Sequence, residues 1–336
     1  MTIERTDLSI GAGATLAGLA FGEASCGLSA GWSGTEAQEF FGRDDVPFEQ
    51  WPRRARGLPL PIRRILRMSG LHGIQTQMAM ACAYADGDSS LDWVVTGFEA
   101  GAWRNFPRGL VSMAHRQRVD YTSRLTKDVT VRPGPIGASV AFLNTGDAAE
   151  RRRATATTLN ALYGDDLTTL VGVVFGEILA RLISGEVPTF SGVIDDLRGE
   201  PEVRTLGLDR LDDVLAVKAG PLSLYGQLIK AIQLALESDA EPDELLGRLL
   251  LDGGASETSG AAAGAILAAR HGLGWCDTTR LVDERRILEC ASWLDGASGS
   301  KQSVVDFLDA ESVLTRQEMA FRDEMMAERR TSPRSS

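Results

Sequence analysis

The sequence is poor in the features that mark secreted, membrane or nucleic-acid-binding proteins. Its 336 residues include only four cysteines. Their positions show no paired spacing, so we expect reduced thiols buried as small hydrophobic groups. Lys and Arg number 35 against 46 Asp and Glu, which gives a net charge of -11. This acidity argues against non-specific binding to nucleic acid or to anionic membranes. No apolar run reaches the length that spans a bilayer.

The first residues also lack the pattern of a secretory signal. Acidic residues stand at positions 4 and 7, where a signal peptide has only basic ones. We therefore expect a cytoplasmic protein. Local basic clusters occur at 53–56, 63–64 and 151–153, and we interpret each as a solvated surface. No pattern in the sequence determines the oligomeric state.

Strand signals are missing as well. No alternation of apolar and polar residues is sustained, no repeat period occurs, and no linker separates two halves. The sequence therefore predicts an all-α protein, a single compact multi-helix orthogonal bundle over residues 1–330 with a disordered tail at 331–336. A nucleophile elbow, a P-loop and a His-Glu-x-x-His motif are absent.

The most informative stretch is 253–272. It begins with a Gly-Gly turn and continues with Ser, Glu, Thr and Ser, which are residues that cap helices. Its body is Ala and Gly, with Ile266 and Leu267 as the only large side chains. We expect a buried central helix over 258–270, with a second small-residue helix at 11–22 packed near it. Its N-terminus could hold an anion or a ligand, although a plain core helix would show the same pattern.

This stretch resembles the C-terminal signature of the ADP-ribosylglycohydrolase family, Gly-Gly-Asp-x-Asp-Thr-Asn followed by a small-residue helix. In that family the two Asp and the Thr hold a pair of Mg²⁺ ions. Here Ala255 stands at the first Asp, Glu257 stands at the second, and Thr258 matches the Thr.

Two further stretches, 9–24 and 70–85, resemble family segments that build the site. The first is similar to the opening helix, with Glu23 in place of the family's Asp. The second is similar to Thr-Asp-Asp-Thr-Gln-Met-Ala from Thr76 onward. The three preceding positions, which supply metal ligands in the family, hold Gly73, Ile74 and Gln75.

A fourth stretch, 128–137, resembles the segment that approaches a diphosphate in the family. Arg132 and the Pro/Gly turn at Gly134 match, but Asp128 stands at the front. A carboxylate there would repel a pyrophosphate. Further on, Tyr163 replaces the His of a Thr-His-Gly-Asp segment. The resemblance therefore implies a pocket for a nucleoside- or NAD-derived small molecule rather than for intact ADP-ribose.

The resemblance does not extend to the metal chemistry. A pair of Mg²⁺ ions needs several hard oxygen ligands, mostly carboxylates. The six matching positions offer only the Glu257 carboxylate, the Gln75 amide and the Thr258 hydroxyl. We expect no dinuclear magnesium site and no other cofactor. A transition-metal site made of Cys82, His271 and Cys276 is a further option, but their spacing matches no known zinc finger.

Two functional hypotheses follow. In the first, the chain is a metal-independent enzyme in which Glu257 is the general acid or base for a glycosidic bond and His72 is the second acid/base group. In the second, it is a catalytically inactive relative that binds a ligand or a protein partner. The predicted ligand-binding residues are Glu23, Gln75, Thr76, Asp128, Arg132, Gly134, Tyr163, Ser256, Thr258 and Ser259. A helix-capping role for Glu257 and a core role for His72 are the structural alternatives.

Overall fold

The computed structural model describes residues 9–42, 53, 55–63, 65–85, 136–163, 166–204, 224–296 and 302–327. Within these ranges the chain forms helices and no strand, which confirms the all-α prediction. The helices closest to the predicted site are α1 (Ala12–Cys26), α5 (Ile74–Tyr84), α9 (Ile136–Ala141), α17 (Ser256–His271) and α19 (Val304–Ala327). The others are α2 (Gly34–Phe41), α4 (Leu60–Arg63), α10 (Ala148–Tyr163), α11 (Asp166–Ile183), α12 (Phe190–Leu197), α13 (Pro201–Arg204), α15 (Leu224–Glu237), α16 (Pro242–Asp252) and α18 (Glu284–Leu294). The predicted tail at 331–336 lies outside the described residues.

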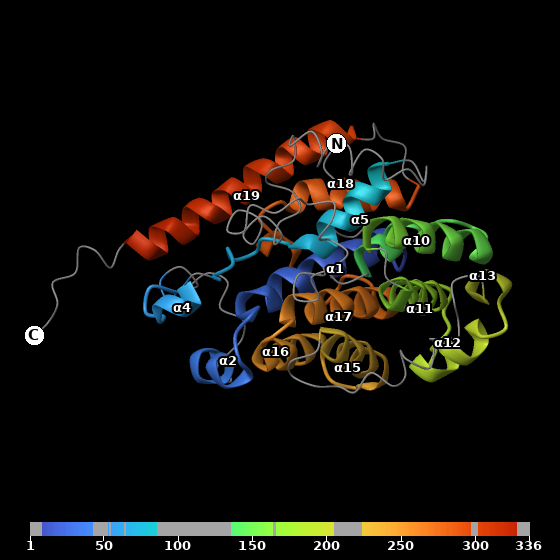
Figure 1. Ribbon diagram of the computed structural model, residues 1–336, viewed down its shortest axis with the longest axis horizontal. Helices are drawn as coiled ribbons and strands as arrows, with labels where there is room; N and C mark the ends of the chain where they lie inside the picture. Colours follow the sequence, from blue (N-terminus) through green and yellow to red (C-terminus); the bar gives the residue numbers. More distant parts are fainter. Residues whose placement is uncertain are drawn as a thin grey trace, which may run out of the picture.

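The two small-residue helices, α1 and α17, lie side by side at the centre of the bundle (Figure 1). Glycines let their backbones approach. A Cβ atom added to Gly22 would collide with the carbonyl oxygen of Gly260, and one added to Gly264 would collide with that of Gly18. Residues 258–269 of α17 are all buried. The predicted central helix and its α1 neighbour are therefore confirmed.

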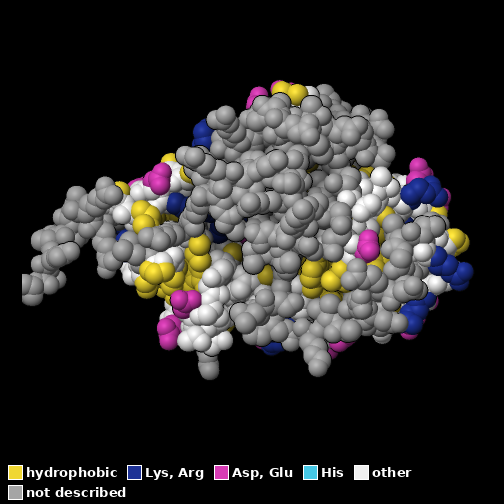
Figure 2. All heavy atoms as spheres, in the orientation of Figure 1, with side chains coloured by type: hydrophobic (Ala, Val, Ile, Leu, Met, Phe, Trp, Pro, Cys, Tyr) yellow, Lys and Arg dark blue, Asp and Glu magenta, His cyan; other side chains and the backbone are white. Residues whose placement is uncertain are grey.

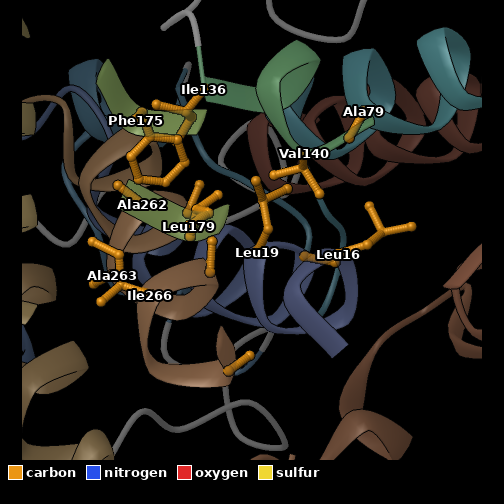
Figure 3. Packing of buried hydrophobic residues seen from close by; sticks show 14 of the residues in the cluster. Leu16, Leu19, Ala79, Ile136, Val140, Phe175, Leu179, Ala262, Ala263 and Ile266 are labelled. Atoms are coloured by element: carbon orange, nitrogen blue, oxygen red, sulfur yellow. The ribbon is translucent and has the colours of Figure 1, made fainter. Parts of the chain in front are cut away.

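The other helices of the core pack around this helix pair. Figure 3 shows Leu16 and Leu19 of α1, Ile266 of α17, and Phe175 and Leu179 of α11 packed together. Helices α15 and α16 pack against α17, and α18 packs against α1. The buried apolar side chains of the described residues, Leu71 excepted, belong to one connected cluster.

The turn before α17 explains the Gly-Gly pair in the sequence. Gly253 and Gly254 have φ angles of 63° and 61°, which favour glycine because other side chains are strained there. The backbone N–H of Gly254 donates to the carbonyl of Trp32 at 2.7 Å. The turn thus joins α16 to α17 and ties the start of α17 to the segment after α1.

Helix α19 crosses one side of the bundle, over α4 and α5 (Figure 1). Its inward face mixes apolar and polar residues, and the buried ones are Phe307, Leu308, Glu311, Thr315, Glu318 and Met325. Because buried carboxylates are costly unless paired, this face indicates that α19 packs on specific partners. Among the described helices, none has the length and apolar character needed to cross a membrane.

Charges of both signs lie together at one end of the described surface. Figure 2 shows basic and acidic side chains next to one another at the end of the molecule that carries α10, α12 and α13. Arg152 pairs with Glu200 at 2.8 Å, and Arg181 pairs with Asp196 at 2.7 Å. The predicted solvated surfaces are nevertheless wrong at two positions, because Arg63 and Arg152 are each only 8% exposed. Arg63 is buried because its guanidinium donates to backbone carbonyls, including that of Leu58 at 2.6 Å.

Candidate functional site

The N-terminus of α5 brings several predicted site residues together. The residue before the helix, Gly73, has no side chain to cap it. Glu23 of α1 caps it instead, accepting hydrogen bonds from the backbone N–H of Gln75 at 2.7 Å and of Thr76 at 2.9 Å. It also accepts one from the Thr76 hydroxyl at 2.6 Å. A carboxylate is favourable there because the amides at a helix N-terminus carry partial positive charge.

A second carboxylate, that of Glu257, reaches the same place from the first turn of α17. A Cβ atom added to Gly73 would overlap Glu257 Oε1 and would lie 2.7 Å from Glu23 Oε1. Both carboxylates therefore contact one side of Gly73, where any larger residue would displace them. The structure thus brings together four predicted site residues, Glu23, Gln75, Thr76 and Glu257.

Arg67 supplies the positive charge beside Glu257. Its Nη1 forms an ion pair with Glu257 Oε1, and its Nε pairs with Glu318 Oε1 of α19 at 2.6 Å. The residue is only 8% exposed. Burial by itself would lower the pKa of the Arg67 guanidinium, but the charges of Glu257 and Glu318 outweigh burial and raise that pKa.

The two neighbouring carboxylates have different surroundings. Burial, and then the charge of Glu257, raise the pKa of Glu23 to about 7, although the hydrogen bonds from Thr76 and Gln75 lower it. Glu23 can therefore carry a proton near neutral pH. Glu257 faces a guanidinium, and its side chain is 20% exposed. Such a difference between adjacent carboxyl groups is typical of acid–base sites.

Gln75 borders the pair on the side of α9. Its Oε1 accepts a hydrogen bond from the backbone N–H of Gly137 at 3.1 Å. Its Nε2 is buried and has no hydrogen-bond partner among the described residues. A buried amide donor usually has a partner, so this N–H group is available to a ligand or to another part of the chain.

The other predicted residues on α17 are buried at its start. The Ser256 hydroxyl donates to the Cys26 carbonyl at 2.7 Å, and Ser29 Oγ lies 3.0 Å from Ser256 Oγ. Ser256 therefore ties α17 to the end of α1. Thr258 and Ser259 are 8% and 4% exposed.

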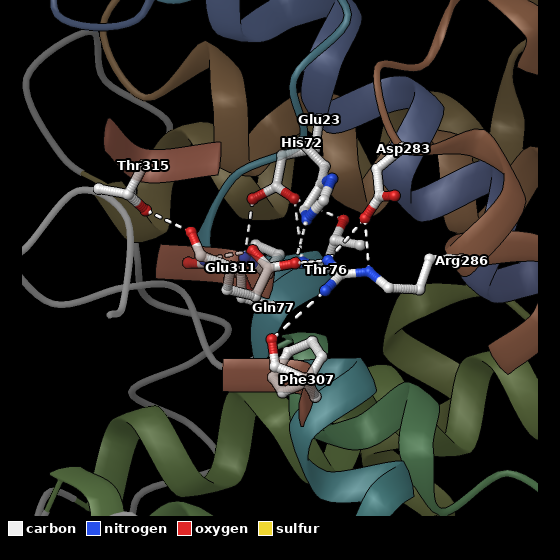
Figure 4. A network of polar contacts seen from close by, with 10 residues as sticks. Glu23, His72, Thr76, Gln77, Asp283, Arg286, Phe307, Glu311 and Thr315 are labelled. Atoms are coloured by element: carbon white, nitrogen blue, oxygen red, sulfur yellow. Dashed lines mark hydrogen bonds and ion pairs between the residues drawn. The ribbon is translucent and has the colours of Figure 1, made fainter. Parts of the chain in front are cut away.

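His72 lies in a neighbouring polar network, shown in Figure 4. The imidazole is fully buried, and its Nε2 is 3.3 Å from Glu311 Oε1 of α19. Glu311 also accepts a hydrogen bond from Gln77 at 2.6 Å and forms an ion pair with Arg286. This geometry supports the structural alternative for His72, a core role, because its Nε2 faces a buried carboxylate of the fold.

Some predicted residues cannot be placed. Asp128, Arg132 and Gly134 lie outside the described residues. Tyr163 is the last residue of α10, and only its backbone is described. Their roles in ligand binding stay predictions.

The donor set does not fit a pair of Mg²⁺ ions. Glu257 is engaged by Arg67, Ile74 and Ala255 bring no side-chain oxygen, and Glu23 accepts three hydrogen bonds. In the part of the chain that the structure describes, no three His, Cys, Asp or Glu residues group closely enough to hold a metal ion. Cys82, His271 and Cys276 all belong to that part, and the structure does not bring them together in one group.

Sequence reasoning missed Arg67 and Glu318, the two residues that complete the charge pattern around Glu257. The only available signal was a basic run before the 70–85 stretch and a charged C-terminal helix, and both patterns are typical of solvated surfaces. Comparison with family models and with curated proteins gave no match. The resemblance to ADP-ribosylglycohydrolases therefore depends on the four short stretches alone.

Proposed function

We propose that the chain is a divergent ADP-ribosylglycohydrolase-like protein that acts without dinuclear magnesium, as an acid–base enzyme on a nucleoside- or NAD-derived small molecule. Cleavage of a glycosidic bond is the reaction we favour. The observation that supports it most is the convergence of Glu23 and Glu257 on the start of α5 in unequal surroundings. Adjacent carboxyl groups in different surroundings are typical of acid–base catalysis.

We assign different roles to the two carboxylates on the basis of their surroundings. Glu257 is the more exposed and is paired with Arg67, so we assign it contact with the substrate and the role of general base toward an attacking water. Glu23 is 1% exposed and binds a proton near neutral pH, so we assign it proton storage behind Glu257. This differs from the general-acid role for Glu257, because its Oε1 already faces the Arg67 guanidinium.

A ligand panel followed by turnover assays tests this proposal. Thermal shifts with ADP-ribose, nucleosides, mononucleotides and acidic pyridine-type metabolites would identify compounds that bind, and each would then be assayed for hydrolysis. We expect Glu257→Gln to reduce turnover by about 100-fold or more while still binding the ligand. Glu289→Gln, a change at a half-exposed site on α18, is the matched control and should leave turnover unchanged. Absence of turnover by the parent on every bound ligand would contradict the enzyme proposal.

A catalytically inactive binding protein is the second candidate, and one specific observation favours it. Arg67 pairs with Glu257, and the amides of α5 and the Thr76 hydroxyl donate to Glu23, so both carboxylates of the site have partners within the protein. Such internal pairing is enough for a cluster that only stabilises the fold. The two candidates differ in the Glu257→Gln variant. An inactive scaffold predicts a loss of stability without any turnover to lose.

A further inference from the structure

Glu318 is the residue through which α19 reaches the candidate site. Glu318 is 2% exposed and lies on the buried side of α19, on the same face of the helix as Glu311. Each of these two glutamates meets a buried cation from the core. Glu311 pairs with Arg286, whereas Glu318 pairs with Arg67.

The contacts of Glu318 hold the backbone and the side chain of Arg67 together. Its Oε1 accepts from Arg67 Nε at 2.6 Å and from the backbone N–H of Met68 at 3.3 Å. Its Oε2 pairs with Arg322 at 3.1 Å, and Arg322 Nε donates to the carbonyl of Leu66 at 2.5 Å. The segment 66–68 is thus held at three consecutive residues by one turn of α19.

Because Glu318 fixes the guanidinium group of Arg67, it also affects the contact between Arg67 and Glu257. It is planar and rigid, so fixing the direction of Nε also fixes the direction of Nη1. In Arg67, Nε points to Glu318 and Nη1 points to Glu257. The carboxylate on α19 therefore determines where the opposite edge of the guanidinium lies.

We propose that Glu318 is a positioning residue that holds Arg67 against Glu257, which makes α19 a part of the site. Its importance for catalysis rests on the proposed function, whereas its hold on Arg67 does not. In the full chain, a guanidinium held at both edges exchanges its Nε proton slowly with water, because exchange requires the hydrogen bond to open. Exchange at this proton therefore reports directly on the proposed contact.

The test measures exchange of the Arg67 Nε proton by NMR in the full chain, with the resonance assigned by its loss in Arg67→Lys. We expect Glu318→Ala to accelerate this exchange by about tenfold or more. Glu318→Gln should cause a smaller change because it keeps an oxygen acceptor for Nε. Glu311→Ala is the matched control, since it removes a buried glutamate from the same face of α19 whose ion pair is with Arg286, whereas Glu318 pairs with Arg67. It should leave the Arg67 exchange rate close to that of the parent.

Unchanged exchange in Glu318→Ala would overturn the proposal. Equal acceleration in Glu318→Ala and Glu311→Ala would also overturn it, because both variants would then merely loosen α19. If Glu318→Ala does not fold, as circular dichroism would show, Glu318→Gln decides the question, and unchanged exchange in it refutes the proposal. None of these results depends on turnover. A parent without activity would refute the proposed function and leave the Arg67 result standing, whereas an active parent should lose kcat in Glu318→Ala with little change in KM.

Discussion

Glu23 of α1 and Glu257 of α17 contact the same side of Gly73 at the start of α5. The charge of Glu257 contributes to the raised pKa of Glu23, so protonation of one carboxylate depends on the other. The pair thus links the two central helices, α1 and α17, to the segment that carries Arg67 and His72. Its properties can be tested without knowing a substrate.

The first prediction concerns the pH dependence of stability. The Glu23 carboxyl has an ordinary pKa of 4.5 when unfolded and a pKa of about 7 when folded. Between these values the folded state holds a proton that the unfolded state has released, so raising the pH lowers the free energy of unfolding. Between pH 4.5 and pH 7, we expect the free energy of unfolding of the parent to fall by up to about 3 kcal/mol relative to that of Glu23→Gln. Urea denaturation of both proteins across this range measures the difference.

Glu36 provides a control of opposite sign. Hydrogen bonds from the backbone and side chain of Ser33 lower the pKa of Glu36. Its contribution to stability is therefore present above the unfolded pKa and lost as the pH falls, so Glu36→Gln should be relatively more stable in acid than at neutral pH. Parallel pH profiles for the parent and Glu23→Gln would show that Glu23 does not take up a proton on folding.

The second prediction concerns the close packing of α1 and α17. A methyl group at Gly264 would collide with the backbone of Gly18. We expect Gly264→Ala to destabilise the protein by about 1–3 kcal/mol, as overpacking does in tight cores. At Gly247 of α16, a Cβ meets no described atom within 4 Å, so Gly247→Ala should be neutral or stabilising by up to about 1 kcal/mol. Equal stability of the two variants in chemical denaturation would contradict the packing.

The third prediction compares the contributions of a buried and an exposed ion pair to the free energy of unfolding. Arg67→Met removes the cation that pairs with Glu257 and leaves the buried Glu318 with Arg322 alone. We expect a loss of about 3–5 kcal/mol in the free energy of unfolding. Arg285 pairs with Glu289 on the surface, where its side chain is 89% exposed, and Arg285→Met should have no measurable effect. A small loss in Arg67→Met would mean that the Glu257 carboxylate takes up a proton or reaches solvent once Arg67 is gone.

The central helix pair could be predicted because its pattern is local. A run of Ala and Gly with a Gly-Gly turn in front indicates a helix with close neighbours whatever the rest of the chain does, and residues 258–269 are buried accordingly. Glu23 and Thr76 were both predicted as ligand-binding residues from the resemblance, and in the structure a hydrogen bond joins them. In both cases the sequence near the residue carried the information.

Arg67 and Glu318 could not be predicted in this way, because their burial depends on each other across 251 positions of the chain. A lone Arg or Glu on a charged segment is usually solvated, and nothing near either residue indicates its partner. The surroundings of His72 could not be predicted for the same reason, because its partner is also far away in the sequence. Its neighbours in sequence suggested a catalytic site, whereas the fold pairs it with Glu311 of α19.

The last prediction concerns magnesium. The oxygen atoms nearest to the position that resembles a metal site are engaged, because Glu257 pairs with Arg67 and Glu23 accepts hydrogen bonds from Gln75 and Thr76. A Mg²⁺ ion would have to displace a guanidinium that is itself held by Glu318, and it gives up its hydration water reluctantly. We therefore expect calorimetric titration with Mg²⁺ to show no binding at micromolar affinity, and thermal stability to respond equally to MgCl₂ and to NaCl at matched ionic strength. Two tightly bound ions per chain would show that the motif alignment is wrong and that other carboxylates build the site.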